Sequence, residues 1–159
     1  MDKVLSILDQ DARFTPEQIS EMTGKEISEV IALIEKYEKE GVIRGYKTII
    51  DWEKTDRELV TALIEVKVTP QVGMGFDKIA QQICRYREVE SVYLMSGGFD
   101  LTVIINGRTM KEVAYFVSDK LSPMSTVLST TTHFVLKKYR DQGIDFEQGP
   151  KDQRGALSV

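Results

Sequence analysis

The sequence has little of the chemistry from which most enzyme and metal sites are built. It contains one cysteine, Cys84, and one histidine, His133, among 159 residues. A single cysteine excludes a disulfide within the chain and a zinc site made of cysteines. A single histidine leaves a histidine-based metal site or a Ser-His-Asp triad short of parts. There is also no phosphate-loop motif, so we expect no catalytic residue, no metal ligand and no cofactor.

Long apolar runs and targeting features are absent as well. The longest apolar run is only a few residues, too short for a helix that spans a membrane. The N-terminus lacks the basic-then-apolar pattern of a signal segment, so we expect a cytoplasmic protein with no membrane partner. The net charge of −4 argues against indiscriminate binding to nucleic acid, without excluding a local basic surface. With 42% hydrophobic residues, the chain can bury the core of one domain or two small ones.

Residues 1–45 have the pattern of three short helices. The segment Thr15-Pro16-Glu17-Gln18 predicts the start of the second helix, with a threonine cap, a proline in the first turn and a glutamine three residues after the cap. We expect Ile19 and Met22 to form the buried face of this helix, and Gly24 to end it.

The third helix is predicted to begin at Ser28, which can cap it, and to run to about Glu40 before a C-cap at Gly41. Its apolar side is predicted to consist of Val30, Ile31, Leu33, Ile34 and Tyr37. A short helix, a brief glycine-containing turn and a longer helix are typical of a helix-turn-helix motif, whose second helix enters the major groove of DNA. Any three-helix bundle gives a similar pattern, so that alternative stays open on the pattern alone.

A charged connector, residues 46–57, separates this predicted helix-turn-helix domain from the rest of the chain. Residues 47–50 are predicted to form a short strand. Trp52 is the one apolar residue in the segment that follows, and we interpret it as a packing residue at a domain or subunit junction rather than as a ligand stacker.

From residue 58 to 146 the pattern changes to strands and two helices in the order β-α-β-β-α-β, the ferredoxin-like plan. The whole chain is therefore predicted to be α+β. Two helices should cover one face of a four-stranded antiparallel sheet. The strands read as apolar on both sides, so we expect a second copy of the chain to cover the other face. Residues 147–159 are polar and unpatterned and are predicted to form a mobile tail.

The stretch from Ser91 to Gly107 carries the clearest binding feature. Two apolar runs flank Ser96-Gly97-Gly98-Phe99-Asp100, which predicts two antiparallel strands joined by a tight turn. Gly97 and Gly98 permit positive φ and leave their backbone N–H groups uncovered. These amides suit the carboxylate of a zwitterion, and the Asp100 carboxylate suits its ammonium. The alternative is an ordinary hairpin in which Asp100 hydrogen-bonds its own turn.

Two segments together resemble the Lrp/AsnC family, the leucine-responsive and asparagine-responsive regulators of bacteria and archaea. Glu38–Tyr46 is similar to the family's E-x-x-G-V-I-x-G-Y segment, and Ser96–Asp100 to its T-G-x-Y-D turn, with Ser for Thr and Phe for Tyr. The resemblance covers about residues 2–146.

This resemblance implies a sequence-specific transcription regulator that binds double-stranded DNA. It also implies a homodimer that joins into tetramers or octamers, with a small effector, commonly an amino acid, held between dimers near the glycine-containing turn. The implied effector-binding residues are Gly97, Gly98, Phe99, Asp100, Thr130 and Thr132. For the two threonines, ordinary strand propensity is the alternative explanation.

The third helix departs from the family in its charge. Basic residues are usual there, often an arginine where Leu33 stands. Residues 1–47 carry seven basic and ten acidic side chains, a net charge of −3, whereas a surface that binds phosphates should be locally positive.

Three interpretations follow. The basic residues can cluster on one side while the acids face away, or oligomers can multiply a weak interaction. Alternatively, the protein is a small-molecule sensor or interaction protein whose weakened helix-turn-helix binds DNA poorly. We favour the first two together. Glu29 can accept from cytosine N4 or serve only as a first-turn acid. The expected DNA contacts are Lys25, Ser28, Glu29, Ala32, Lys36, Arg44 and Lys47.

Overall fold

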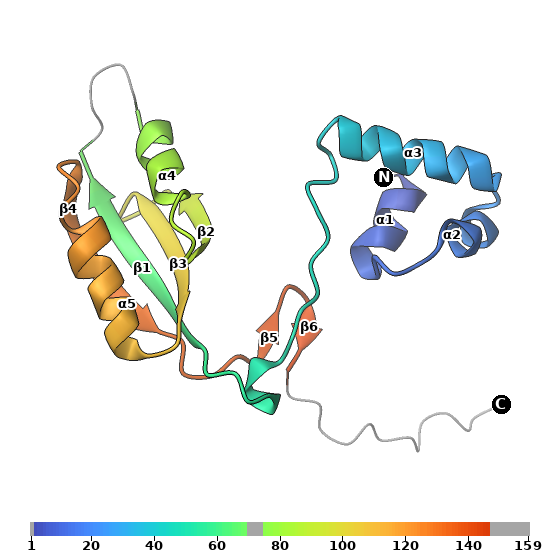
Figure 1. Cartoon of the computed structure of the whole chain (residues 1–159). Helices are drawn as coiled ribbons and strands as arrows, with labels where there is room; N and C mark the ends of the chain where they lie inside the picture. Colours follow the sequence, from blue (N-terminus) through green and yellow to red (C-terminus); the bar gives the residue numbers. More distant parts are fainter. Residues whose placement is uncertain (1, 70–74, 147–159) are drawn as a thin grey trace. The chain divides into compact units, whose positions relative to one another are not determined.

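The computed structural model describes residues 2–69 and 75–146. The chain divides into two units, Met1–Thr48 and Ile49–Val159, both drawn in Figure 1. The tail predicted at residues 147–159 lies outside the described residues.

The N-terminal unit contains three helices, α1 (Lys3–Gln10), α2 (Pro16–Thr23) and α3 (Ile27–Lys39). Its core centres on Val4, Ile19 and Val30, one fully buried side chain from each helix. Isolated helices of this length are marginal in water, so it is this shared apolar core that holds the three together.

The predicted capping signals are present in the structure. The Thr15 side chain accepts the Gln18 N–H at 3.4 Å, and the Gln18 side chain accepts the Thr15 N–H at 2.9 Å, which completes a capping box at the start of α2. Gly41 follows α3 with φ 71°, the left-handed conformation predicted for it.

Two details of these helices differ from prediction. The N-cap of α3 is Glu26, so Ser28 lies inside the first turn and does not cap the helix. Met22 and Ile31, which were expected to be buried, are 47% and 41% exposed. Both side chains remain exposed because the core between three short helices is small and is occupied by Val4, Ile19 and Val30.

The strand predicted at residues 47–50 is absent. Within the described chain, residues 44–50 find no partner strand, and a strand without a partner has no ladder to stabilise it. A single 3-10 turn, η1 (Trp52–Lys54), follows.

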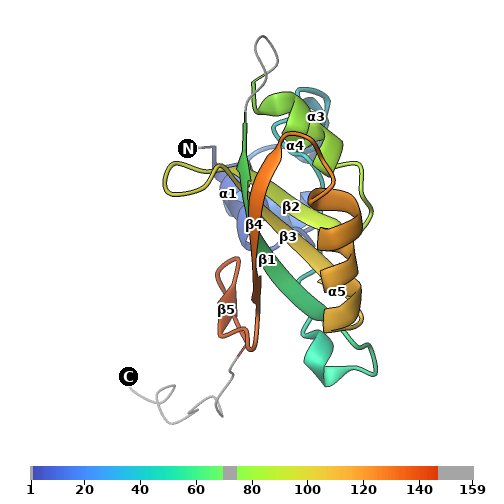
Figure 2. The same cartoon turned by 90° about the vertical axis from the view of Figure 1, so that its left-hand side faces the viewer.

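The C-terminal unit is built on a four-stranded antiparallel sheet with the order β2-β3-β1-β4. Its strands are β1 (Val60–Val68), β2 (Val89–Leu94), β3 (Leu101–Gly107) and β4 (Val127–Phe134). Its helices are α4 (Asp77–Ile83) and α5 (Met110–Phe116), which the π-helical turn η2 (Val117–Leu121) extends. Figure 2 shows α4 and α5 on the same side of the sheet. The predicted β-α-β-β-α-β fold is thus confirmed.

Alternation along β1 decides which side chains are buried. Ala62, Ile64 and Val66 are fully buried and form the centre of the core under the helices. The other face of β1 carries Thr61, Leu63, Glu65 and Lys67. On this uncovered face of β1 only Leu63 is apolar. The expectation that both faces of the sheet are apolar was therefore wrong.

A short hairpin that the sequence pattern did not predict follows β4. It consists of β5 (Arg140–Asp141) and β6 (Ile144–Asp145), joined through Gln142 and Gly143, which both have positive φ. The last long strand, β4, ends at Phe134. Among the described residues, no helix is long and apolar enough to cross a membrane.

Candidate DNA-binding and effector sites

Ser28, Ala32 and Lys36 form one exposed stripe along α3. They are spaced four residues apart, so they lie one above another on the same side of the helix. The buried Val30 is on the opposite side. The structure thus brings three of the seven expected DNA contacts onto one outward surface, which we call the α3 stripe.

Lys25 and Glu29 are joined in an ion pair beside this stripe. The Glu29 carboxylate raises the pKa of the Lys25 ammonium above its ordinary value. Each side chain therefore already has a partner of opposite charge in the free protein. A phosphate contact by Lys25, or a cytosine contact by Glu29, has to compete with this pair.

Acidic residues are not confined to the far side of α3. Glu35 is exposed and stands seven residues after Ser28, which is two helical turns, so it shares the side of the α3 stripe. It also adjoins Lys36 in sequence. The interpretation that the acids face away from the basic residues was therefore wrong, because Glu29 and Glu35 flank the stripe itself.

Leu33 points toward the bundle core. It packs, partly buried, against Val4, Ile19 and Val30. An apolar residue at this position stabilises the bundle. Because position 33 faces the core, having leucine there instead of arginine does not change the charge of the outward α3 stripe.

Arg44 and Lys47 lie in the extended segment after α3, and both are exposed. Arg44 folds back near the end of the helix, where a Cβ added to Gly41 would lie 3.0 Å from Arg44 Nη1. These two basic residues are therefore a separate group from the α3 stripe.

The glycine-containing turn is a six-residue loop, Met95–Asp100, between β2 and β3. The Met95 N–H donates to the Asp100 carbonyl at 2.8 Å and closes the loop, which is wider than the tight turn predicted from the sequence. Gly97 has φ 154°, whereas Gly98 does not have positive φ. A Cβ added at either glycine would meet no atom within 4 Å, so the space beside their α-carbons is open.

Asp100 is fixed to the end of β1 by two hydrogen bonds. Its N–H donates to the Val66 carbonyl at 3.1 Å, and its Oδ2 accepts the Val68 N–H at 2.8 Å. The Asp100 carbonyl closes its own loop, whereas the Asp100 carboxylate holds the neighbouring strand β1 and not its own turn. The Val68 bond uses Oδ2 and leaves Oδ1 outside it.

Thr130 and Thr132 lie on the helix-covered side of the sheet. They pair across the sheet with Val66 and Ile64, both fully buried, and directly opposed residues point to the same face. Leu101 also pairs with Val66 and so points to the helix-covered face. Asp100, one residue earlier, therefore points to the opposite face. Within one chain, the structure does not bring the two threonines and the Asp100 carboxylate onto one face.

The exposure of three apolar side chains where β2 meets the loop was not recognised from the sequence. Tyr93, Leu94 and Met95 are 53%, 60% and 41% exposed. The signal was present, since these residues read as an apolar strand, but the sequence does not show that β2 is an edge strand. Tyr93 pairs with Thr102 and Leu94 with Leu101, so these two side chains lie on opposite faces at the edge of the sheet.

Both units match known protein families. Residues 3–44 match the model described as a winged helix-turn-helix DNA-binding domain, and residues 61–144 match the Lrp/AsnC ligand binding domain. The uncharacterized HTH-type transcriptional regulator YugG of Bacillus subtilis (strain 168) is 54% identical, over 98% of this chain and 95% of its own length. The HTH-type transcriptional regulator FL11 of Pyrococcus horikoshii is 30% identical, over 87% of this chain and 89% of its own.

Solved structures have the same fold. MtbAldR has a TM-score of 0.74 and 25% identity, covering 87% of this chain and 92% of its own. A transcriptional regulator from Neisseria meningitidis, solved in complex with L-Met, has a TM-score of 0.71 and 24% identity, covering 87% and 89%.

The fold and these matches define a class of protein, a helix-turn-helix transcription regulator with a ligand-binding domain, and not an enzyme. More specifically, the chain belongs to the Lrp/AsnC family, as its two sequence segments predicted.

Proposed function

We propose that this protein is a sequence-specific transcription regulator that responds to an amino acid bound between dimers at the Met95–Asp100 loop. One observation carries the proposal: the Val68 N–H fixes the Asp100 carboxylate at the end of the same loop in which Gly97 and Gly98 are open, with no atom within 4 Å of an added Cβ. Backbone amides suit the carboxylate of an amino acid, and Asp100 Oδ1 suits its ammonium. Two structural neighbours, from Neisseria meningitidis and M. tuberculosis, were solved with methionine, which supports an amino acid as the effector class.

A second copy of the chain is needed to complete this pocket. Tyr93, Leu94 and Met95 are exposed at the edge strand where the loop begins, and we propose that association of copies buries some of this apolar surface. Thr130 and Thr132 share the other face within one chain, so in this proposal they reach the effector only from a neighbouring protomer. We therefore propose homodimers that join into tetramers or octamers, with the effector where they meet.

On the DNA side, the α3 stripe is proposed to face the major groove. In this proposal Ser28 and Ala32 contact base edges, and Lys36 contacts a phosphate. Of the other expected contacts, Lys25 and Glu29 flank the start of the stripe, and Arg44 and Lys47 are assigned to the flanking backbone.

The interleaved acids make the phosphate attraction of one such surface weak. Several helix-turn-helix units held in one oligomer can still bind tightly, because the second contact forms at high effective concentration. The protein is proposed to act in this way in the cytoplasm.

The proposed switch is a change in assembly. An effector that binds one arrangement of dimers better than another shifts the protein toward that arrangement. The change in assembly moves the paired helix-turn-helix units relative to their half-sites, and so changes DNA affinity.

A second candidate function is favoured by the net charge of −3 over residues 1–47. In that case the protein is a small-molecule sensor or interaction protein that binds DNA poorly. Salt separates the two functions, because binding through phosphates weakens steeply as salt rises.

The effector assignment is tested by adding each common L-amino acid to the full chain and measuring its thermal unfolding. A bound effector stabilises the folded state, so we expect one or a few amino acids to raise Tm. Sedimentation velocity then measures the size of the assembly with and without that amino acid. No stabilisation by any of them, or stabilisation with no change in assembly, would contradict the proposed switch.

A further inference from the structure

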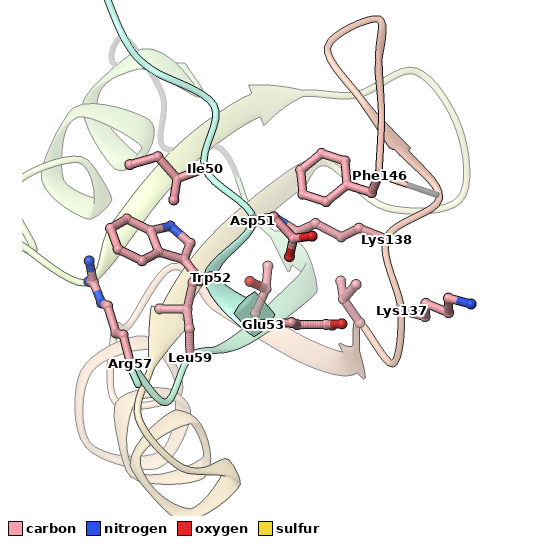
Figure 3. A pocket seen from close by; sticks show the side chains of 11 residues that line it. Ile50, Asp51, Trp52, Glu53, Arg57, Leu59, Lys137, Lys138 and Phe146 are labelled. Carbon is pink, nitrogen blue, oxygen red and sulfur yellow. The ribbon is translucent and has the colours of Figure 1, made fainter. Parts of the chain in front are cut away.

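A second pocket, of about 140 Å³, lies within the C-terminal unit (Figure 3). One wall comes from the connector and the start of β1, and includes Trp52, Arg57 and Leu59. The other comes from the chain after β4, and includes Val135, Lys138 and Phe146. Two segments that are far apart in the sequence therefore enclose it.

This pocket is separate from the loop that contains Asp100. Thr61, which lines the pocket, is the second residue of β1, whereas Asp100 bonds to Val68 at the other end of the same strand. Seven residues of strand at about 3.3 Å each place these two points roughly 23 Å apart. One small ligand cannot span both.

The size of the pocket limits its occupant. Its volume of about 140 Å³ is several times the roughly 30 Å³ of one water molecule. It is also well below the roughly 300–1,000 Å³ typical of sites for drug-sized ligands. A small metabolite is therefore the fitting class of ligand.

The apolar part of the lining consists of two aromatic and three aliphatic side chains. In Figure 3, the Trp52 indole lies beside Arg57, and the Phe146 ring comes from the chain on the other side of Asp51. This composition suits a ligand whose body is aliphatic or aromatic.

The charged side chains of the lining are Asp51, Glu53, Arg57, Lys137 and Lys138. Arg57 is the one that stacks on Trp52. Its guanidinium carbon lies 4.4 Å from the centre of the Trp52 ring, and no carboxylate within the described residues forms an ion pair with it. By contrast, Asp51 pairs with Lys54 at 3.2 Å, and Lys138 pairs with Asp141 at 3.3 Å. The guanidinium, fixed by stacking and still lacking an anion, is a ready partner for a carboxylate.

We propose that this pocket binds a small organic carboxylate with an apolar body, which contacts Trp52 and pairs with Arg57. The class includes hydrophobic amino acids and the corresponding 2-oxo acids. The two kinds of ligand differ in whether an ammonium adjoins the carboxylate. The site requires neither DNA nor an occupied Met95–Asp100 loop.

The chain provides its own reporter, because Trp52 is the only tryptophan. The full-length protein is titrated with L-leucine, with 4-methyl-2-oxopentanoate and with 3-methylbutan-1-amine, which lacks a carboxylate, while Trp52 emission is recorded. We expect a saturable change with at least one carboxylate and none with the amine. A response to the 2-oxo acid shows that the carboxylate suffices, and a response to leucine alone adds an ammonium contact; either supports the proposal.

Three variants locate the signal. Arg57→Gln should weaken binding at least about tenfold, while Arg13→Gln, which removes an exposed arginine of the N-terminal unit, should bind as the wild type does. Asp100→Asn should also bind normally. The proposal is overturned by the absence of a saturable change up to about 10 mM carboxylate, by unaltered binding in Arg57→Gln, or by loss of the signal in Asp100→Asn.

Discussion

The Asp100 carboxylate accepts the backbone N–H of Val68 at 2.8 Å and so joins the glycine-containing loop to the end of β1. The Asp100 N–H strengthens the same junction through the Val66 carbonyl. Asp100 therefore has a structural role in addition to the proposed role at the effector. The two roles need different properties, since the structural bond needs an acceptor oxygen and the effector needs a negative charge.

Asparagine at position 100 separates these roles. Asp100→Asn keeps an acceptor for the Val68 N–H but removes the charge, so we expect near wild-type stability together with loss of effector binding at the Met95–Asp100 loop, while the pocket at Trp52 is unaffected. Asp100→Ala removes the acceptor as well and should cost about 1–3 kcal/mol of unfolding free energy. Urea denaturation measures the stability of each variant, and calorimetric titration measures its binding of the effector. Tight binding of the effector by Asp100→Asn would refute the ammonium contact.

The two glycines of the loop should respond differently to alanine. Gly97 has φ 154°, which a side chain disfavours, whereas Gly98 does not have positive φ. Space does not distinguish them, because a Cβ at either meets no atom within 4 Å. Gly97→Ala should therefore lower the unfolding free energy by about 1–2 kcal/mol, and Gly98→Ala by less than about 0.5 kcal/mol. Equal losses in denaturation experiments would show that φ at Gly97 is not what the loop requires.

Neighbouring residues of α3 should shift DNA affinity in opposite directions. Lys36→Gln removes a cation from the α3 stripe, so it should weaken binding and reduce the salt slope by about one. Glu35→Gln removes an acid from the same side and should strengthen binding. Both side chains are exposed, so neither change should alter Tm, and an unchanged Tm shows that the fold is intact. If neither change alters affinity or slope, the DNA contacts lie elsewhere.

Tyr37 links the third helix to the start of the first. Its hydroxyl donates to the Asp2 carboxylate, which also caps α1 by accepting the Val4 N–H at 2.8 Å. The bond from Tyr37 is the main reason that the pKa of Asp2 lies below its ordinary value. Stability from a lowered pKa is fully present above the unfolded value of about 3.9 and is lost as the pH falls through the folded value.

Tyr37→Phe should therefore reduce Tm at neutral pH, and the difference from wild type should shrink toward about pH 3. Tyr46→Phe is the matched variant, because its hydroxyl bonds to the exposed Glu38 and is expected to matter less. Thermal melts at the two pH values make the comparison. A Tyr37→Phe deficit that stays constant with pH would show that the hydroxyl acts independently of the Asp2 charge.

The sequence predicts the fold well because the signals that set it are local. The capping box at Thr15 is closed by Gln18, three residues away, and Thr109 accepts the Glu112 N–H at the start of α5 in the same way. Alternation in β1 likewise places Ile64 and Val66 in the core. Each of these features depends on residues within one turn or one strand, where periodicity is informative.

The candidate sites depend on contacts that sequence spacing does not reveal. The bond from Val68 to Asp100 joins residues 32 positions apart, and the second pocket joins Trp52 to Phe146. Burial was misjudged at Met22 and Ile31 because apolar character was taken to mean burial, although exposed apolar residues are common on small domains. The roles of these sites remain predictions.

Whether the protein is a DNA-binding regulator is best measured by titrating it against DNA from upstream of its own gene and recording fluorescence anisotropy. The titration is done at two salt concentrations, with and without the amino acid that raises Tm. We expect binding that weakens as salt rises and an affinity that shifts when the amino acid is present. A folded, oligomeric sample that fails to bind DNA at low salt would contradict the account and make the sensor the leading function.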